Sequence, residues 1–233
     1  MTSIGLIGGI GPAAAVIYYQ RLCKAMAERK MPLGLTMVQA DIHPLIANAN
    51  SDNRDAQASI FAPLIDRLKA AGADCAVITS IGAHFCFDET RARSSLPLVS
   101  AIKPLDDHFA ARGMGRVGLL GTWVAMRTRL FGQMKRTAAI APDTEFQEVG
   151  QLYQDMAITG TCPESTREVL FDAGRRMMAR GAEAVVLAGT DLNLAFDGRD
   201  PGFPVIDALQ IHVDLLADLA SGRKTLEEAA DQR

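Results

Sequence analysis

The sequence is poor in the residues that build metal and redox centres. Only four of its 233 residues are cysteines, and their spacing fits neither a zinc knuckle nor a CxxC redox motif. No feature indicates an oxidising compartment, so we expect all four thiols to be free. The four histidines lack the HxH or HExxH spacing of a protein-built metal site. We therefore expect no metal.

A surplus of positive charge and a long hydrophobic run are also missing. The chain has 24 Lys and Arg residues against 27 Asp and Glu residues, a net charge of −3, so we expect no binding to nucleic acid. No apolar run reaches the roughly 18 residues of a membrane helix, which argues against a membrane partner. The apolar residues 1–19 lack the cationic start of a signal peptide and contain Pro12 and several glycines. We interpret them as part of the fold and expect a cytoplasmic protein.

What the chain does contain is a regular alternation of short and long hydrophobic segments. Short β-rich segments alternate with longer amphipathic stretches that are typical of helices. Repeated strand–helix–strand order implies right-handed crossovers and mainly parallel sheets that are covered on both faces, so the predicted fold class is α/β. The predicted strands are residues 3–7, 35–40, 76–79, 97–100, 117–120, 145–149, 184–187 and 204–206.

Three segments of the first half recur in the second half in the same order. They are residues 5–9 (GLIGG) and 118–122 (GLLGT), 72–74 (GAD) and 181–183 (GAE), and 96–101 (LPLVSA) and 203–208 (FPVIDA). The offsets are 113 (118 − 5), 109 (181 − 72) and 107 (203 − 96). This agreement predicts two similar α/β units of the same topology.

The repeat also predicts where a ligand binds. We expect an N-terminal half of residues 1–103, with residues 208–233 packing back on it, and a C-terminal half of residues 104–207. If a pseudo-twofold axis relates the halves, the carboxyl ends of their strands form the crevice in which ligands bind. The offset of 109 pairs Ser80 with Gly189, so these two strand ends are expected to face each other across the cleft.

The first predicted strand ends in a glycine-rich turn. Gly9, Gly11 and Ala14 fit the G-x-G-x-x-G/A pattern of dinucleotide-binding turns. No acidic residue follows at a strand end about twenty positions later, and Pro12 removes one backbone N–H near the helix start. We favour a tight turn that presents backbone amides to a small anion such as a carboxylate. No nicotinamide, flavin or other cofactor is expected.

These segments together resemble the aspartate/glutamate racemase superfamily. The resemblance rests on residues 4–12, 72–74, 79–84, 119–122 with Met126, 181–191 and the strand at 204–207, and it extends over nearly the whole chain. It implies two pseudo-symmetric α/β domains with the active site between them, no pyridoxal phosphate, and a homodimer. It also implies racemisation of amino acids by two cysteines, one from each half, which remove the α-proton from one face and deliver a proton to the other.

The sequence departs from this superfamily at both cysteine positions. The first cysteine usually lies in a Cys-Asn-Thr-x-His segment, which here reads SIGAH, so Ser80 replaces it. The second usually lies in Gly-Cys-Thr-Glu, which here reads AGTD, so Gly189 replaces it. A thiol populates both protonation states near neutrality, whereas a serine hydroxyl does not and glycine has no side chain. A symmetric two-thiol mechanism is therefore not encoded unless another group enters the site. Cys86 is the nearest thiol, and we interpret it as a small buried hydrophobe.

The remaining polar residues of these segments are the candidates for binding and chemistry. Ser80, His84 and Asp191 are the candidate catalytic groups. Asp191 can receive an α-ammonium group or act as a base, His84 can act as an acid, and the Ser80 hydroxyl can bind a carboxylate. Ser80 and Asp191 could instead cap helices, and His84 could instead hold the start of its helix by bonding to the backbone. We assign no role to Arg54 or Arg127. The residues expected to bind the substrate are Gly9, Gly11, Thr79, Gly82, Thr122, Gly189 and Thr190.

The predicted function is that of an isomerase-class enzyme that performs cofactor-independent α-proton chemistry on a small amino acid or dicarboxylate. One alternative is a lyase or decarboxylase of the same superfamily, whose members work with one cysteine and an enolate-like intermediate. Another is a catalytically silent protein that retains the ligand site. Deuterium exchange at the α-carbon, release of carbon dioxide or an alkene, and a ligand-dependent thermal shift without turnover distinguish the three.

Overall fold

Two four-stranded parallel sheets organise the part of the chain that the structure describes, residues 1–9 and 12–229 of the computed structural model. Unit 1 comprises Met1–Pro104 with Gln210–Arg233, and unit 2 comprises Leu105–Leu209. All strand pairs within both sheets are parallel, and helices flank each sheet, which confirms the predicted α/β class.

The sheet of unit 1 has the order β2-β1-β3-β4. Its strands are β1 (Ile4–Gly8), β2 (Leu35–Gln39), β3 (Cys75–Ile78) and β4 (Leu98–Val99). Every residue of β1 and β3 is buried, as expected for the central strands of a parallel sheet with helices on both faces. The core of this unit therefore lies on both sides of β1 and β3.

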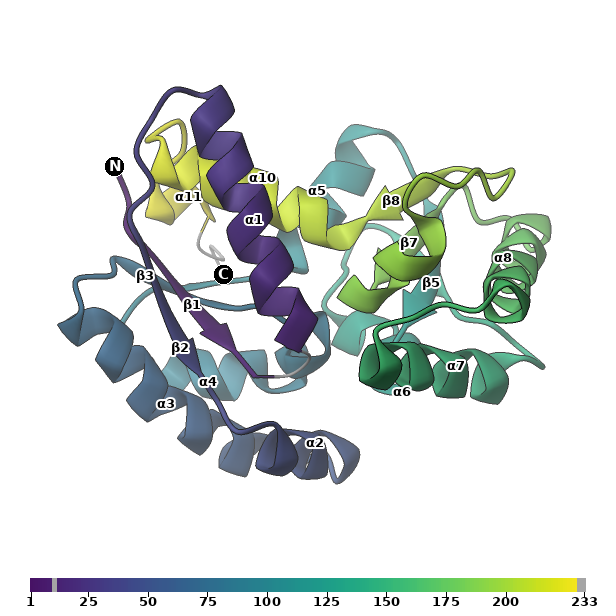
Figure 1. Ribbon diagram of the computed structural model, residues 1–233, viewed down its shortest axis with the longest axis horizontal. Helices are drawn as coiled ribbons and strands as arrows, with labels where there is room; N and C mark the ends of the chain where they lie inside the picture. Colours follow the sequence, from purple (N-terminus) through teal and green to yellow (C-terminus); the bar gives the residue numbers. More distant parts are fainter. Residues whose placement is uncertain (10–11, 230–233) are drawn as a thin grey trace. The chain divides into compact units, whose positions relative to one another are not determined.

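Helices cover both faces of this sheet. In Figure 1, α1 (Pro12–Glu28) lies on one face with α10 (Ala208–Ala220), and α3 (Arg54–Ala70) lies on the other. The hydroxyl of Tyr18 in α1 lies 2.8 Å from Nδ1 of His212 in α10, in the buried seam of these helices. The remaining helical segments of the unit are α2 (Ile42–Asn50), the 3-10 helix η1 (Ile81–Cys86), α4 (Phe87–Arg93) and α11 (Leu226–Ala229).

Unit 2 repeats this architecture with the sheet order β6-β5-β7-β8. Its strands are β5 (Arg116–Gly121), β6 (Ala138–Ile140), β7 (Val185–Ala188) and β8 (Val205–Asp207). Its helical segments are α5 (Lys103–Ala111), α6 (Trp123–Arg127), η2 (Leu130–Gly132), α7 (Phe146–Thr159), α8 (Glu164–Ala179), η3 (Thr190–Leu192) and α9 (Asn193–Phe196).

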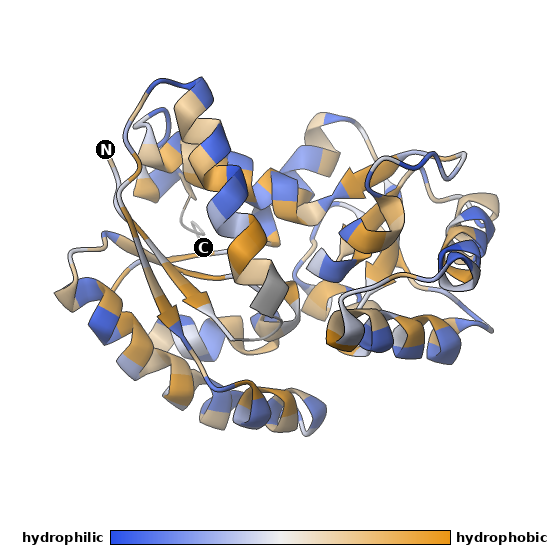
Figure 2. Cartoon of the chain, in the orientation of Figure 1, coloured by the Kyte–Doolittle hydropathy of each residue, from blue (hydrophilic) through white to orange (hydrophobic). Residues whose placement is uncertain are grey.

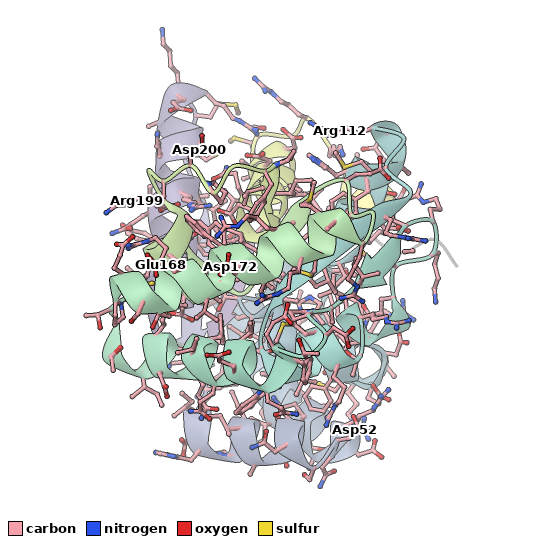
Figure 3. The ribbon with its side chains drawn as sticks, turned by 90° about the vertical axis from the view of Figure 1, so that its right-hand side faces the viewer. Asp52, Arg112, Glu168, Asp172, Arg199 and Asp200 are labelled. Carbon is pink, nitrogen blue, oxygen red and sulfur yellow. The ribbon has the colours of Figure 1, made fainter. Side chains whose placement is uncertain are left out.

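Helix α8 shows how the hydrophobic pattern of a segment determines which side it buries. Leu170, Ala173 and Met177 recur every three or four positions and are fully buried, so they form one face of the helix. Glu168 and Asp172 are exposed and lie along its outer side (Figure 3). Figure 2 shows the same alternation of hydrophobic and hydrophilic residues along α3 and α8.

The strand registers place the sequence repeat in equivalent positions of the two sheets. Ile7 pairs with Ile78 in unit 1, and Leu120 pairs with Leu187 in unit 2, which reproduces the offsets of 113 (120 − 7) and 109 (187 − 78). The β3–β4 and β7–β8 registers likewise agree with the offset of 107. Ser80 and Gly189 therefore follow equivalent strand ends, each within its own unit.

One predicted strand is wrong. Residue 145 is the N-cap of α7 and residues 146–149 form its first turn, and the outer strand of this sheet is instead β6, which contains only Ala138–Ile140. Residues 145–149 resemble a strand over five positions, but Val149, Tyr153 and Met156 continue a buried pattern of helical spacing. The other seven predicted strands lie within two residues of observed ones.

The chain passes between the units at α5 and returns at α10. Helix α5 follows β4 of unit 1, yet from Leu105 onward it belongs to unit 2. There the buried carboxylate of Asp106 accepts hydrogen bonds from the backbone N–H groups of Lys135 and Arg136. Helix α10 follows β8 of unit 2, yet from Gln210 onward it belongs to unit 1. Unit 1 is thus built from two separate stretches of sequence.

Candidate functional site

The predicted site residues lie at the carboxyl ends of central strands. In unit 1, Gly9 follows β1, and Thr79, Ser80, Gly82 and His84 follow β3. In unit 2, Thr122 follows β5, and Gly189, Thr190 and Asp191 follow β7. Because the strands of each sheet are parallel, each set shares one edge of its own sheet. Gly11 lies outside the described residues.

Gly9 is needed for its backbone geometry. Its φ angle is +135°, a conformation that residues with a side chain rarely adopt. A Cβ atom at this position would lie 2.6 Å from the carbonyl oxygen of Ala40, in the segment that follows β2. The glycine therefore allows two strand ends of unit 1 to approach each other closely.

Thr79 and Ser80 use their hydroxyl groups differently. The Thr79 hydroxyl donates a hydrogen bond to the Ile7 carbonyl oxygen at 3.0 Å and is buried, so its proton is used to link the end of β3 to β1. Ser80 precedes η1 but makes no capping hydrogen bond through its side chain, and it is only partly buried. Of the two, Ser80 is the residue whose hydroxyl proton is available to a ligand.

His84 holds two turns of unit 1 together. The backbone N–H of Ala101 donates to Nε2 at 3.0 Å, so Nδ1 carries the ring proton and donates to the Ser80 carbonyl oxygen at 2.9 Å. The ring is fully buried and stacks on Phe87. Burial lowers the pKa of His84 to about 4, because it disfavours the charged form. This geometry argues against proton transfer by His84. The hydrogen bonds of His84 position the backbone around Ser80.

Cys86 is not a reactive thiol in this fold. Its sulfur is fully buried, donates to the Ala83 carbonyl oxygen at 3.4 Å and lies 3.5 Å from the Thr90 hydroxyl. Burial raises the pKa of Cys86 to about 11 and that of Cys75 to about 12. The thiolate that a catalytic cysteine needs is therefore scarce at both positions near neutral pH. All four cysteines are free thiols.

Thr122 begins α6 and caps it. Its Oγ1 accepts a hydrogen bond from the Ala125 N–H at 3.2 Å, which leaves the hydroxyl proton free to be donated. Thr190, the first residue of η3, is partly buried, and no hydrogen bond to another described residue engages its hydroxyl. Both hydroxyls can therefore donate to a carboxylate.

Asp191 forms a buried pair with a residue that the sequence does not single out. Only 7% of Asp191 is exposed, and its Oδ2 accepts a hydrogen bond from the Tyr153 hydroxyl at 3.1 Å. Burial raises the pKa of Asp191, while the bond from Tyr153 opposes that rise. Burial also raises the pKa of Tyr153 well above its usual value, and the charge of Asp191 adds to this effect. The pair thus combines a protonated phenol with a carboxylate of increased basicity.

Tyr153 reaches this position from α7, 36 residues (189 − 153) before Gly189. A Cβ atom on Gly189 would lie 2.5 Å from Cε2 and 2.6 Å from the hydroxyl oxygen of Tyr153. The absence of a side chain at Gly189 and the helical spacing of Tyr153 were both visible in the sequence. Neither one indicates that the two residues meet, because that contact is tertiary.

The two arginines without an assigned role lie on the surface. Arg54, at the start of α3, lies 3.0 Å from Asp52 Oδ1 and 3.9 Å from Glu89 Oε1. Arg127 ends α6 and is exposed.

Among residues 1–9 and 12–229, no three His, Cys, Asp or Glu side chains are grouped so as to hold a metal ion. In the same part of the chain, no helix is both long enough and apolar enough to cross a membrane.

Comparison with known proteins agrees with this architecture. A family model described as Asp/Glu/Hydantoin racemase matches residues 7–216. The fold is similar to that of a candidate Asp/Glu racemase from Yersinia pestis, with a TM-score of 0.84 and 23% identity over 95% of this chain and 100% of that one. An aspartate racemase homologue from Pyrococcus horikoshii OT3 has a TM-score of 0.80 and 24% identity over the same shares. An arylmalonate decarboxylase has a TM-score of 0.53 and 16% identity over 92% of each chain. At these identities the structures establish the shared fold.

Proposed function

Because the chain belongs to the Asp/Glu/Hydantoin racemase family, we propose that it moves a proton at the α-carbon of a small amino acid or related carboxylate without a cofactor. The observation that carries the proposal is the carboxylate of Asp191, buried at the carboxyl end of a central strand and hydrogen-bonded to a buried phenol. Burial increases the basicity of a carboxylate, which suits it to abstract a proton near neutral pH.

The hydroxyl groups near the strand ends are the proposed donors to a carboxylate bound at the sheet edge of their own unit, Ser80 in unit 1 and Thr122 and Thr190 in unit 2. Ser80, Thr122 and Thr190 each have a hydroxyl proton that the described structure does not use. Donors of this kind stabilise the negative charge that develops on a carboxylate when its α-carbon loses a proton. Thr79 is a weaker candidate, because its proton is bonded to Ile7.

The test is deuterium exchange at the α-carbon, followed by NMR in D₂O. Aspartate, glutamate and small dicarboxylates are incubated with the wild type, Ser80→Ala and Asp191→Asn. We expect the wild type to exchange at least one of them, and Asp191→Asn to lose at least ~100-fold in rate, the usual contribution of a general base. Glu168→Gln, on the exposed side of α8, is the matched control and should leave the rate unchanged (Figure 3). Ligand binding by thermal shift with no exchange of any compound would overturn the proposal.

A decarboxylase is the second candidate, and one observation favours it. The strand end of unit 1 presents a serine hydroxyl, a neutral buried histidine and a buried thiol, none of which is suited to accept a proton near pH 7. Loss of carbon dioxide generates a carbanion without prior proton removal, so a single proton donor completes the reaction. Release of carbon dioxide from phenylmalonate, a substrate of the kind named for the similar decarboxylase, would support this activity.

A further inference from the structure

Unit 2 has no side chain at residue 189, but the space beside this residue is filled. A Cβ atom on Gly189 would lie 2.5 to 2.7 Å from three atoms of the Tyr153 ring and hydroxyl, well inside van der Waals contact. Even an alanine would therefore require the phenol to move. Tyr153 occupies the volume that a side chain of residue 189 would need.

The helix that carries Tyr153 is itself held by close packing. Val149 and Met156 of α7 are buried, and Gly150 lies against the indole ring of Trp123, where a Cβ atom would overlap the ring. These contacts lie within one turn of Tyr153 on either side. Because the backbone of α7 is fixed in this way, the phenol is placed beside Gly189 by the fold of unit 2 and not by a mobile loop.

The equivalence of the two strand ends points to a chemical role for the side chain that fills the space beside Gly189. Ser80 has the same position after β3 as Gly189 has after β7, as the strand registers require. Unit 1 presents a hydroxyl from the strand end itself. Unit 2 presents a phenolic hydroxyl from α7, and that hydroxyl donates to Asp191 at 3.1 Å.

We propose that Tyr153 is the proton-transfer group of unit 2, acting with Asp191 in place of the missing side chain of Gly189; this rests on the proposed α-proton chemistry. In the forward step the α C–H bond breaks and its proton passes to the Tyr153 oxygen. The phenol's own proton passes to Asp191 Oδ2, which becomes a neutral acid. The electron pair remains on the substrate as the enolate of its carboxyl group. Reversal of both transfers restores the α C–H bond.

This relay keeps the phenol neutral throughout. It therefore agrees with the burial of Tyr153, which disfavours a phenolate. At the equivalent strand end of unit 1, His84 and Cys86 are buried and bonded to backbone carbonyls, and the Ser80 hydroxyl has no hydrogen bond to a described carboxylate. A single proton-transfer group of this kind acts on one face of the substrate. The expected reaction is α-proton exchange with retention of configuration, and not racemisation.

The closing experiment measures deuterium exchange and chirality together, with L-aspartate or L-glutamate as the probe. Wild type should exchange the α-proton while the product stays L. Tyr153→Phe should reduce exchange at least ~100-fold, while Tyr19→Phe, which removes an exposed hydroxyl from α1, should have no effect. A silent wild type overturns the proposed function and this relay together. An active wild type with an equally active Tyr153→Phe overturns the relay alone. Formation of the D-enantiomer as fast as exchange overturns the restriction to one face.

Two readouts test the pair independently of turnover. The protein has three tyrosines, so ¹³Cζ-tyrosine labelling gives few signals, and Tyr153→Phe identifies that of Tyr153. Asp191→Asn should shift this signal, and an unchanged signal would contradict the pairing. Gly189→Ala should lower the Tm of the wild type more than that of Tyr153→Ala, because the second variant has no ring to displace. Equal losses would show that Tyr153 does not fill this space.

Discussion

Lowering the pH from 8 to 5 should remove about 4 kcal/mol from the free energy of unfolding through two histidines of unit 1. His84 and His212 are fully buried, and burial lowers their pKa values from 6.5 to about 4 and about 3, with the nearby His84 contributing to the shift of His212. At pH 5 both remain neutral in the folded protein, whereas both are charged in the unfolded chain. The unfolded state therefore binds more protons, and stability falls as the pH drops below 6.5.

The magnitude follows from proton linkage. At pH 5 an unfolded histidine with a pKa of 6.5 gains about RT ln(1 + 10^1.5), or about 2 kcal/mol, that the folded form does not gain. Two such residues give about 4 kcal/mol, a large part of the stability of an ordinary domain. The loss continues until the pH reaches the folded-state pKa values near 4 and 3.

The assay is urea unfolding at pH 8 and pH 5, followed by circular dichroism. Fluorescence of Trp123, the single tryptophan, follows unit 2, which contains neither of the two buried histidines. His212→Gln should reduce the pH-dependent loss by about 2 kcal/mol. NMR of the ¹³Cε1 groups should show no titration of His84 or His212 between pH 8 and pH 5. A midpoint above pH 5.5 for His84 would refute its assignment as a buried neutral residue.

Three further perturbations test separate parts of the structure. Cys75 and Cys86 should resist a thiol reagent such as DTNB at pH 8 until the protein unfolds, because both are buried and their pKa values are raised to about 12 and about 11. Rapid labelling of either thiol in the folded protein would contradict this prediction. Gly9→Ala should cost about 1–4 kcal/mol in urea unfolding, because its Cβ atom would lie 2.6 Å from the Ala40 oxygen, and an unaltered midpoint would speak against the turn geometry. Asp106→Ala should cost about 2–4 kcal/mol, since two backbone N–H groups before β6 lose their acceptor, and Trp123 fluorescence should detect the loss in unit 2.

The fold was largely predictable because the repeat left local traces in the sequence. The segments GLIGG and GLLGT lie at equivalent places along β1 and β5, where close packing against neighbouring strands and helices restricts side-chain size. The strand at residues 145–149 was mispredicted because β6 has only three residues, two of them alanine, and gives little β signal of its own. The formation of a short edge strand depends on its pairing with the neighbouring strand more than on the β propensity of its own residues.

The site was less predictable, because its polar groups are defined by contacts between distant residues. Motif position located Ser80 and Asp191 at strand ends, where the structure places them. It did not distinguish the free hydroxyl of Ser80 from the bonded hydroxyl of Thr79, nor a buried, backbone-bonded His84 from a solvent-accessible acid. Tyr153 was missed for the same reason, since its hydrophobic helical spacing predicts only a core residue.

The chain crosses from unit 1 to unit 2 at α5 and returns to unit 1 at α10. The order in which the two units are synthesised therefore differs from the order in which they can be completed. Unit 2 is one continuous stretch, so all of its residues are available once Leu209 has left the ribosome. The strands of unit 1 precede unit 2 in the sequence, yet the face of their sheet that α1 shares with α10 is only partly covered until α10 is made (Figure 1). Tyr18 must wait for His212, 194 residues later, to form its buried hydrogen bond. The strands of unit 1 are therefore made before unit 2 but fully covered only after it, and during that interval β1 and β3 leave part of an apolar surface exposed, the kind of surface that chaperones and other nascent chains bind.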